Sequence, residues 1–395
     1  QKDDAMLYQN EIEAIHGTDY PKSKAQNGLL VSDMRGLDYN DPKWELLLNQ
    51  LDYSSGDIDK LITQGCYYTH PLDVIGQAKV IDTDGPQGIT LGNNSNVYCG
   101  EVVLASTWNK NLAKEVGLAI GAEMFACGYG KLYGPALNIH RSVFSGRNYE
   151  YFSEDPIIAG YMAAEEMSGL ITNGCVPTMK HFALNNQEKN RSKVSTYCNE
   201  QAMREIYFKA FEIAHKKTDA TIKYQEKNVE NVIEKEREIK GSLGVMVSMN
   251  CIGSTFTACN RALIQNLLRD EWGFEGTICT DTSEDSSKDV ATPDECIAAG
   301  ITQFLGSTAK NIAHKNDAYM QRAIRDVIHN GAYAYANSSM TNVSAGSVIN
   351  YGISPWRYYQ IGINIGVALL LIGLLFDLIY RELKYKKVNI SIDKK

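Results

Sequence analysis

Two aspartates and four basic side chains stand at the ends of apolar, strand-like runs or in the loops after them. They are Asp84, Arg147, Lys180, His181, Arg191 and Asp281. Cleavage of a glycosidic bond requires carboxyl groups, and selective recognition of hydroxyl groups requires fixed hydrogen-bond donors and acceptors. Cations near a carboxylate favour its charged form and keep it nucleophilic. We expect these six residues to form one site for a carbohydrate.

Each of the six also has a simpler structural explanation. Asp84 could occupy a turn, and Asp281 could cap a helix. Arg147 could form a structural ion pair with Glu150, and a lone histidine such as His181 is more often a satisfied core residue than a catalyst. The other two cations could be surface charges. All six in such positions would be a larger coincidence, which favours a site.

The elements that must position these residues alternate between strands and helices. Strands are predicted at residues 79–84, 132–140, 176–181, 244–250, 277–281 and 301–305, and helices at 101–121, 156–173, 200–217 and 261–272. This alternation implies a parallel sheet. Polar residues at the carboxyl ends of the strands are typical of an α/β TIM-like (β/α) barrel, which we expect to be incomplete or irregular at its last strands. A doubly wound open sheet gives the same alternation.

The composition separates the chain into zones. Residues 1–41 are polar and read as a linker or the edge of a missing upstream domain, and residues 42–350 form the expected barrel. Within it, residues 216–242 are a charged insertion, which we expect to be a solvated surface helix because glutamates recur every fourth residue. The 395 residues carry a formal net charge of −8, which disfavours a nucleic-acid partner.

The C-terminal part predicts one membrane span. Residues 361–380 are almost wholly apolar and long enough to cross a hydrocarbon core, and aromatic residues extend the expected transmembrane helix to 359–380. Arg381, Lys384, Lys386 and Lys387 begin a basic tail, residues 381–395. The positive-inside rule places that tail in the cytoplasm. We expect a single-pass protein of the cell membrane with its large domain extracellular.

The cysteine content gives no sign of a metal or cofactor site. There are 9 cysteines, and none forms a Cys-x-x-Cys pair of the kind that binds zinc or exchanges disulfides. We expect them to be buried as small apolar residues.

Several stretches, taken in order, resemble glycoside hydrolase family 3, the β-glucosidase and β-xylosidase type. They are residues 84–88, 146–156, 180–188 with Arg191, 204–207, 268–274 and 280–281. The ordered set is far more specific than any one motif. The resemblance implies a barrel domain and the hydrolysis of terminal β-linked glucosides or xylosides, with a carbohydrate as the partner.

The resemblance also implies roles for the six residues. Asp281 matches the nucleophile that forms a covalent glycosyl-enzyme in a retaining mechanism. Asp84 matches the acidic residue that binds hydroxyls on the far side of the sugar ring. The basic residues that line the same pocket are matched by Arg147, Lys180, His181 and Arg191.

The sequence departs from the family at three points. Thr282 replaces an aromatic residue after the nucleophile, and Met249 replaces a tyrosine or phenylalanine. The general acid/base of the family commonly lies on a second α/β domain, and no such domain follows the barrel. We therefore expect a member with reversed domain order and an upstream α/β domain that carries the acid/base. Glu284 and Asp285 are local substitutes that only proximity recommends.

Two other functions fit parts of this pattern. Met249 and Thr282 favour a non-catalytic, membrane-bound sugar-binding relative, whereas retention of the six residues favours an enzyme. The family's β-N-acetylglucosaminidase branch has a glycine-rich loop with an Asp-Ser-His signature after its Lys-His motif. Residues 184–188 replace that loop here, which disfavours that branch.

Overall fold

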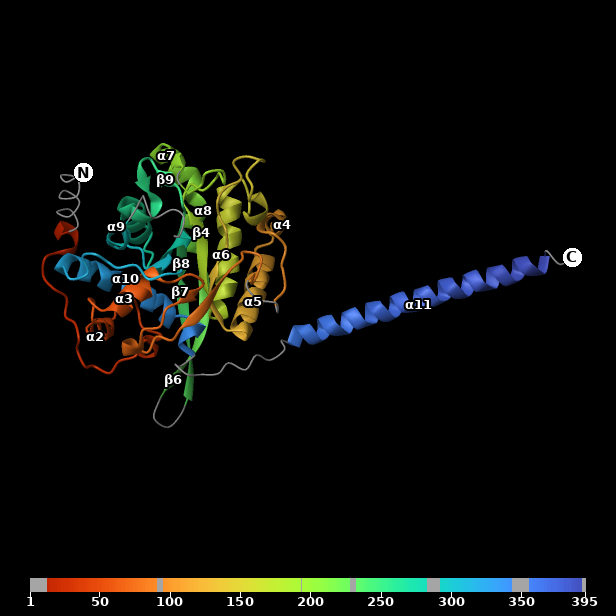
Figure 1. Ribbon diagram of the computed structural model, residues 1–395, viewed down its shortest axis with the longest axis horizontal. Helices are drawn as coiled ribbons and strands as arrows, with labels where there is room; N and C mark the ends of the chain where they lie inside the picture. The colour runs from red at the N-terminus through yellow and green to blue at the C-terminus, as the bar shows by residue number, and fades with distance from the viewer. Residues whose placement is uncertain are drawn as a thin grey trace. The chain divides into compact units, whose positions relative to one another are not determined.

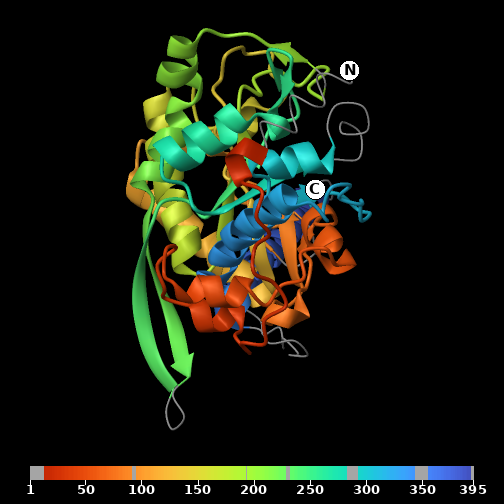
Figure 2. The ribbon, with the colours of Figure 1, turned by 90° about the vertical axis from the view of Figure 1, so that its left-hand side faces the viewer.

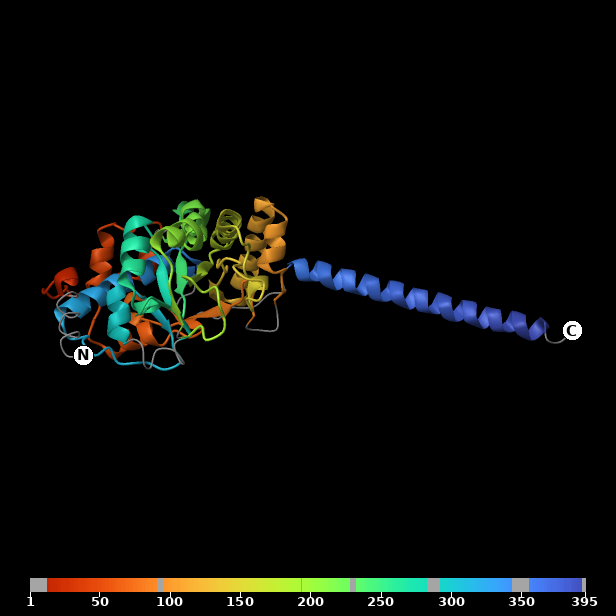
Figure 3. The same ribbon diagram turned by 90° about the horizontal axis from the view of Figure 1, so that it is seen from above.

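A computed structural model describes residues 13–90, 95–192, 194–227, 232–282, 292–342 and 355–392. The chain divides into two compact units, Gln1–Val348 and Ile349–Lys395, and each is described by itself. The first unit contains a curled sheet flanked by helices, and the second contains one long helix (Figures 1 and 3).

The sheet of the first unit has the strand order β1-β2-β3-β4-β8-β11-β12. All neighbouring pairs are parallel except β1–β2. The strands are β1 (Tyr68–Thr69), β2 (Val80–Asp84), β3 (Tyr129–Tyr133), β4 (Val176–Phe182), β8 (Gly244–Val247), β11 (Thr277–Thr282) and β12 (Gln303–Leu305). The parallel strands follow each other around the sheet in chain order. Each helical connection therefore joins one strand to its neighbour in the sheet.

Hydrogen bonds join the two edges of this sheet. Just before β1, the amide of Gly65 donates to the carbonyl of Phe304 at 2.9 Å, and the amide of Cys66 donates to the carbonyl of Gly306 at 3.2 Å. The open-sheet alternative therefore gives way to a TIM-like barrel. The irregularity expected at the last strands is present, because the register shifts within the pair β11–β12. The sheet is also irregular elsewhere: β1 runs against its neighbour, and the register shifts within the pairs β2–β3 and β4–β8.

Most predicted strands lie within a few residues of the observed ones, but the prediction for 132–140 is displaced. Strand β3 begins at Tyr129 and ends at Tyr133. The next residues are Gly134 and Pro135, and a proline has no amide hydrogen to donate to a strand ladder. The apolar residues after Pro135 belong instead to the loop that leads to the predicted site.

The predicted helices form, with two of them broken into shorter pieces. Asn109 breaks the first, because its side chain accepts the amide of Leu112 at 3.2 Å and starts a new helix. The predicted segments contain α4 (Glu101–Ser106), α5 (Lys110–Cys127), α6 (Pro156–Thr172), α7 (Glu200–Ala202), η4 (Met203–Tyr207), α8 (Lys209–Lys217) and η6 (Ala262–Glu271). The sequence analysis missed α2 (Lys43–Leu48), α3 (Gly56–Thr63), α9 (Pro293–Ala299) and α10 (Ala318–Ala336).

Short elements complete the first unit. The 3-10 turns are η1 (Val31–Met34), η2 (Asp73–Ile75), η3 (Asn148–Glu150), η5 (Thr257–Cys259) and η7 (Ser339–Asn342). A small sheet of order β10-β9-β5 contains β5 (Ser195–Thr196), β9 (Cys251–Ile252) and β10 (Thr255–Phe256).

The interior of the barrel combines apolar packing with one buried ion pair. Tyr133, Met246, Cys279 and Leu305 come from four different strands and form one buried cluster. Beside them, the Lys131 ammonium lies 3.1 Å from the Asp82 carboxylate and donates to the side chain of Gln303. Because a buried charge is tolerated when it is paired, this contact lets polar residues fill the barrel below the site.

The prediction of a surface helix within residues 216–242 is wrong. Strands β6 (Asp219–Lys227) and β7 (Val232–Lys240) form an antiparallel hairpin, which projects from the body of the barrel (Figure 2). A spacing of four is even, so glutamates four apart share a face in a strand as well as in a helix. Ala220, Ile222 and Ile239 are buried, and their alternation with polar residues is the strand signal that the charge pattern obscured.

The described part of residues 1–41 packs against the barrel domain. Val31 and Met34 are buried in the main core cluster, and the ring of Tyr39 stacks on His329 at a centroid distance of 4.1 Å. This segment was interpreted as a linker or the edge of another domain. In the structure its described residues contribute to the core of the first unit.

The second unit is the helix α11 (Pro355–Ile392). Within it, Arg357–Lys386 is long and apolar enough to cross a membrane by length and composition. Its apolar side chains are exposed in the structure.

Candidate functional site

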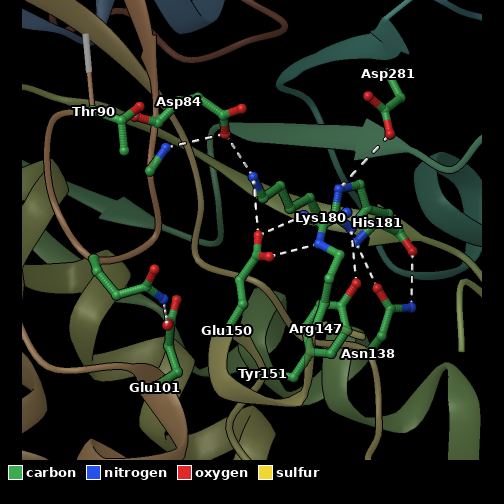
Figure 4. Close-up of polar contacts among 12 residues, drawn as sticks. Asp84, Thr90, Glu101, Asn138, Arg147, Glu150, Tyr151, Lys180, His181 and Asp281 are labelled. Carbon is green, nitrogen blue, oxygen red and sulfur yellow. Dashed lines mark hydrogen bonds and ion pairs between the residues drawn. The ribbon is translucent and has the colours of Figure 1, made fainter. Parts of the chain in front are cut away.

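The structure brings the six predicted site residues to one end of the barrel. Strand β2 ends at Asp84, β4 carries Lys180 and His181 near its carboxyl end, and β11 carries Asp281. Arg147 lies in the loop after β3, and Arg191 lies in the loop after β4. Figure 4 shows Asp84, Lys180, Arg147, His181 and Asp281 converging from these elements. In a (β/α) barrel this is the end where ligand sites form.

A glycine-rich turn holds Asp84 in place. The amide of Gly85 donates to the Asp84 carboxylate at 3.0 Å, and the amide of Gly88 donates to the carbonyl of Gly85 at 3.1 Å. Gly85 has φ +128°, and a Cβ atom there would lie 1.9 Å from the Gly88 carbonyl oxygen. Only glycine fits that position, so the turn keeps Asp84 partly exposed at the strand end.

Lys180 connects the two acidic residues on this side of the site. Its ammonium donates to Asp84 at 2.7 Å and lies 3.3 Å from Glu150. Glu150 also accepts both arms of the Arg147 guanidinium at 2.6 Å. Burial opposes the charge on Lys180, but Asp84 and Glu150 outweigh it and raise the pKa of Lys180. A charged lysine therefore stands beside Asp84 at neutral pH.

Glu150 and Glu188 are site residues that the sequence analysis did not predict. Glu150 appeared there only as a structural partner for Arg147. The structure contains that ion pair and places Lys180 beside it. Glu188 accepts from Arg191 at 3.0 Å and lies 3.8 Å from Arg147. These two glutamates fix the orientation of both guanidinium groups. Both lie inside the family-like stretches 146–156 and 180–188, where the available signal was.

His181 is held by a network that also escaped the sequence analysis. Its backbone amide and carbonyl pair with the side chain of Asn138 at 2.9 and 3.0 Å. Its Nδ1 atom lies 3.4 Å from the Tyr151 hydroxyl, and its Nε2 atom lies 3.8 Å from Asp281. Burial and the nearby arginines and lysine lower the pKa of His181 well below its usual value. The imidazole is therefore neutral and can donate a hydrogen bond.

Asp281 is a carboxyl group in a largely desolvated setting. Its Oδ1 atom accepts the backbone amide of Thr282 at 2.7 Å. Burial raises the pKa of Asp281, although that hydrogen bond and the charges of Arg191, Lys180 and Arg147 act in the opposite direction. The sequence analysis expected nearby cations to keep Asp281 charged. Their effect on its pKa is smaller than the effect of burial.

The two residues that depart from the family pattern differ in burial. Met249 is buried, and Thr282 is partly buried at the end of β11 beside Asp281. Glu284 and Asp285, the local candidates for a general acid, lie outside the described residues. Among the residues described, no group of three histidine, cysteine or acidic side chains is arranged to hold a metal ion.

Known proteins resemble this chain in sequence. The family model for the glycosyl hydrolase family 3 N terminal domain matches residues 74–336. β-Glucosidase A of Butyrivibrio fibrisolvens is 37% identical over 214 residues, covering 53% of this chain and 23% of that protein. A β-glucosidase of Ruminococcus albus is 35% identical over 251 residues, covering 63% and 23%. The chain thus spans about a quarter of the length of these relatives.

Solved structures show the same likeness. β-Glucosidase 3B from Thermotoga neapolitana, solved in complex with glucose, superimposes with a TM-score of 0.63 at 28% identity, over 81% of this chain and 46% of that one. A family 3 β-glucosidase from Bifidobacterium adolescentis gives a TM-score of 0.64 at 26% identity, over 80% and 43%. The family model covers more than half of the chain, and this chain therefore belongs to glycoside hydrolase family 3 through its N-terminal domain.

Proposed function

We propose that the chain supplies the sugar-binding barrel of an enzyme that hydrolyses terminal β-linked glucosides or xylosides. The observation that carries the proposal is the meeting of Asp84 and Asp281 at one barrel end, with Lys180 and His181 of β4 between them (Figure 4). The relatives named above are β-glucosidases, which favours glucosides.

The proposed mechanism retains the configuration of the sugar. The Asp281 carboxylate attacks the anomeric carbon, the bond to the leaving oxygen breaks, and a glycosyl ester forms. The leaving oxygen takes a proton from a general acid. Water then attacks the same carbon and releases Asp281. Because Asp281 is poorly solvated, it has little hydration to lose when it attacks.

The other residues of the site hold the sugar. Asp84 accepts hydrogen bonds from hydroxyl groups, and Lys180 and Arg147 donate to them. The neutral imidazole of His181 donates beside Asp281. Glu150 already holds Arg147, Asp84 holds Lys180, and Asn138 holds the backbone of His181. The site therefore needs little reorganisation as charge develops in an oxocarbenium-like transition state.

Replacement of Asp281 tests the nucleophile. Asp281→Asn keeps the size of the side chain and removes the covalent step, so turnover should fall by about 10³-fold or more in the protein with its complete site. A 2-fluoro glucosyl fluoride should leave a sugar on a peptide that contains Asp281, measured by mass spectrometry. Asp270→Asn, an exposed aspartate on η6, is the matched control and should keep full activity. Labelling of another carboxyl group, or normal turnover by the Asn variant, would refute the assignment.

A second candidate function is sugar binding without catalysis. Met249 and Thr282, which depart from the family pattern, favour it. Thr282 directly follows Asp281 and offers little apolar surface for a sugar ring. The same fluoro sugar separates the candidates: an enzyme is labelled at Asp281, whereas a binding protein holds glucose and stays unlabelled.

We further propose that residues 359–380 cross the cell membrane once, with the barrel outside. The support is the apolar helix Arg357–Lys386 together with the basic residues at its end. Protease added to intact cells should digest the barrel, whereas a cytoplasmic tag after Lys395 should survive until the cells are opened. Full protection of the barrel would contradict this orientation.

A further inference from the structure

The turn that carries Asp84 is held from behind by a buried carboxyl group. Gln87 of that turn donates its side-chain amide to Oε2 of Glu101, the first residue of α4, and Figure 4 shows Glu101 below the contacts of Asp84 and Lys180. The carbonyl of Gln87 accepts the amide of Tyr98 at 2.9 Å. Glu101 is 2% exposed, and its Oε1 atom has no hydrogen-bond partner among the described residues.

A second buried carboxyl group belongs to α6, which packs against α4. Glu166 is 1% exposed, and within the described part of the chain neither of its oxygens has a hydrogen-bond partner. Burial raises the pKa of Glu166 to about 8. Burial, followed by the nearby Glu166 carboxyl, raises the pKa of Glu101 well above its usual value. Two charged carboxylates without partners would be costly in this interior.

The charged groups of the surrounding elements leave this pair without an ion-pair partner in the described structure. Glu150 adds to the raised pKa of Glu101 and is itself paired with Arg147 and Lys180. On α6 the adjacent Glu165 pairs with Lys110 of α5 at 3.6 Å. Other titratable groups on the packed elements include Lys114, Glu115, Glu123 and Cys127 of α5, Lys209, Glu212, His215, Lys216 and Lys217 of α8, and Asp219, Lys223 and Tyr224 of β6.

We propose that Glu101 and Glu166 share a proton, and that this pair positions the Asp84 turn through Gln87. The proposal rests on the sugar-binding role proposed for Asp84. With one proton between them, the carboxyl groups tolerate burial and one of them keeps an acceptor for Gln87. When both are charged they repel each other, and the turn loses the support that aligns Asp84 with Lys180.

The first test is the pH dependence of D-glucose binding by the full chain in detergent micelles. The wild type should lose affinity at least about fivefold between pH 7 and pH 9, as the pair ionises. Glu166→Gln cannot ionise, and its amide can donate to Glu101, so its affinity should stay level over that range. Glu165→Gln changes the neighbouring, half-exposed residue in the same way and should follow the wild type. An equal alkaline loss in the Glu166 variant would overturn the proposal.

The second test needs no sugar. An unfolded glutamate loses its proton near pH 4.5, whereas the folded Glu166 keeps it to about pH 8. The stability contributed by this proton is present below pH 4.5 and is lost as the pH rises to about 8. Glu166→Gln should remove that part of the slope in urea unfolding, and Glu165→Gln should keep it. An unchanged slope in Glu166→Gln refutes proton sharing, whether or not glucose binds.

A third variant isolates the link to the turn. Gln87→Ala leaves both carboxyl groups in place, so the pH slope of unfolding should persist while glucose affinity falls several-fold at every pH. Unaltered affinity in this variant would show that the pair does not act on Asp84. If no form of the chain binds glucose, the proposed function fails, and the unfolding slopes still decide whether the proton is shared.

Discussion

Asp281 and His181 show how burial decides the chemistry of single residues in this site. Both are surrounded by the same cations, yet burial raises the pKa of Asp281 and lowers that of His181. Burial disfavours the charged form of either group. The pair is therefore a carboxyl group whose charge burial disfavours beside a neutral imidazole, and the nucleophilic role proposed for Asp281 requires its ionised form.

The raised pKa of Asp281 predicts an acid limit of activity at a higher pH than a solvent-exposed aspartate would give. The nucleophile must be ionised, so kcat/KM for an aryl glucoside should fall as the pH drops through this raised pKa. Arg191 is among the charges that lower that pKa, and Arg191→Gln should move the acid limb to higher pH. Lys189→Gln, a neighbouring cation outside the network, serves as the control. An acid limb that moves down in the Arg191 variant would contradict the assignment.

The sequence analysis selected six side chains that the structure places at one end of the barrel, but not the residues that hold them. The roles given to the six stay predictions. Motif order identified Asp84, Lys180 and Asp281, because these types and spacings occur together in one family. Each glutamate lies three residues from one arginine, Glu150 from Arg147 and Glu188 from Arg191, so these two ion pairs are local. The contacts of Glu150 with Lys180 and of Glu188 with Arg147 depend on which loop lies beside which strand, and no local pattern contains that information. The direction of the pKa change at Asp281 also depends on depth of burial, which charge counting omits.

At the scale of elements, strands were predicted better than the connections between them. Buried parallel strands such as β8, whose four residues are glycine, valine, methionine and valine, are continuous apolar runs, which are readable from sequence. The hairpin β6–β7 was predicted as a helix because charges four residues apart share a face in both strands and helices. Helix α10 was missed although it is long and amphipathic. The alanines and tyrosines of its second half are buried on several sides.

The contact between helix α9 and the turn η5 predicts a disulfide bond under oxidising conditions. Cys296 of α9 has its sulfur 3.2 Å from that of Cys259 in η5, although the sequence suggested only small apolar roles for the cysteines. With glutathione disulfide as the oxidant, the two thiols should lose two electrons and two protons and form one bond, yielding two molecules of glutathione. The free energy of unfolding should rise by about 2–4 kcal/mol.

Peptide mass analysis after alkylation measures this bond, and urea unfolding measures its effect. The hydrogen bond with Cys259, followed by burial, raises the pKa of Cys296, so the reaction should be faster at alkaline pH. Cys259→Ser should gain no stability on oxidation, whereas Cys66→Ser should behave as the wild type. Two thiols that both stay open to alkylation after unfolding of the oxidised protein would exclude the bond.

At the scale of the whole molecule, the proposed mechanism needs two carboxyl groups, of which the barrel supplies Asp281. A retaining site needs a second carboxyl group about 5–5.5 Å from the nucleophile. Asp84, Glu150 and Glu188 are engaged with cations, and Glu284 and Asp285 lie outside the described residues. We therefore assign the general acid to an upstream α/β domain of the same protein as a proposal.

Two substrates test this division of labour. General acid catalysis typically contributes about 10²–10⁴-fold, so residues 1–395 alone should cleave an unactivated disaccharide poorly. An aryl glucoside with a good leaving group needs less protonation and should still transfer its sugar to Asp281. Burst and steady-state rates with both substrates measure the difference, first for this chain and then for a protein that includes the proposed upstream domain. Efficient disaccharide cleavage by the chain alone would place the acid inside the barrel.

The hydrogen bonds that close the barrel also bear on how the chain is made. Gln303 donates to the carbonyl of Gly65 across 238 residues of sequence, and the amide of Gly65 donates to Phe304. A ribosome adds about 5–20 residues per second, so the early edge waits at least about ten seconds for its partner. During that interval the growing chain exposes an unpaired strand edge, the kind of surface that chaperones bind.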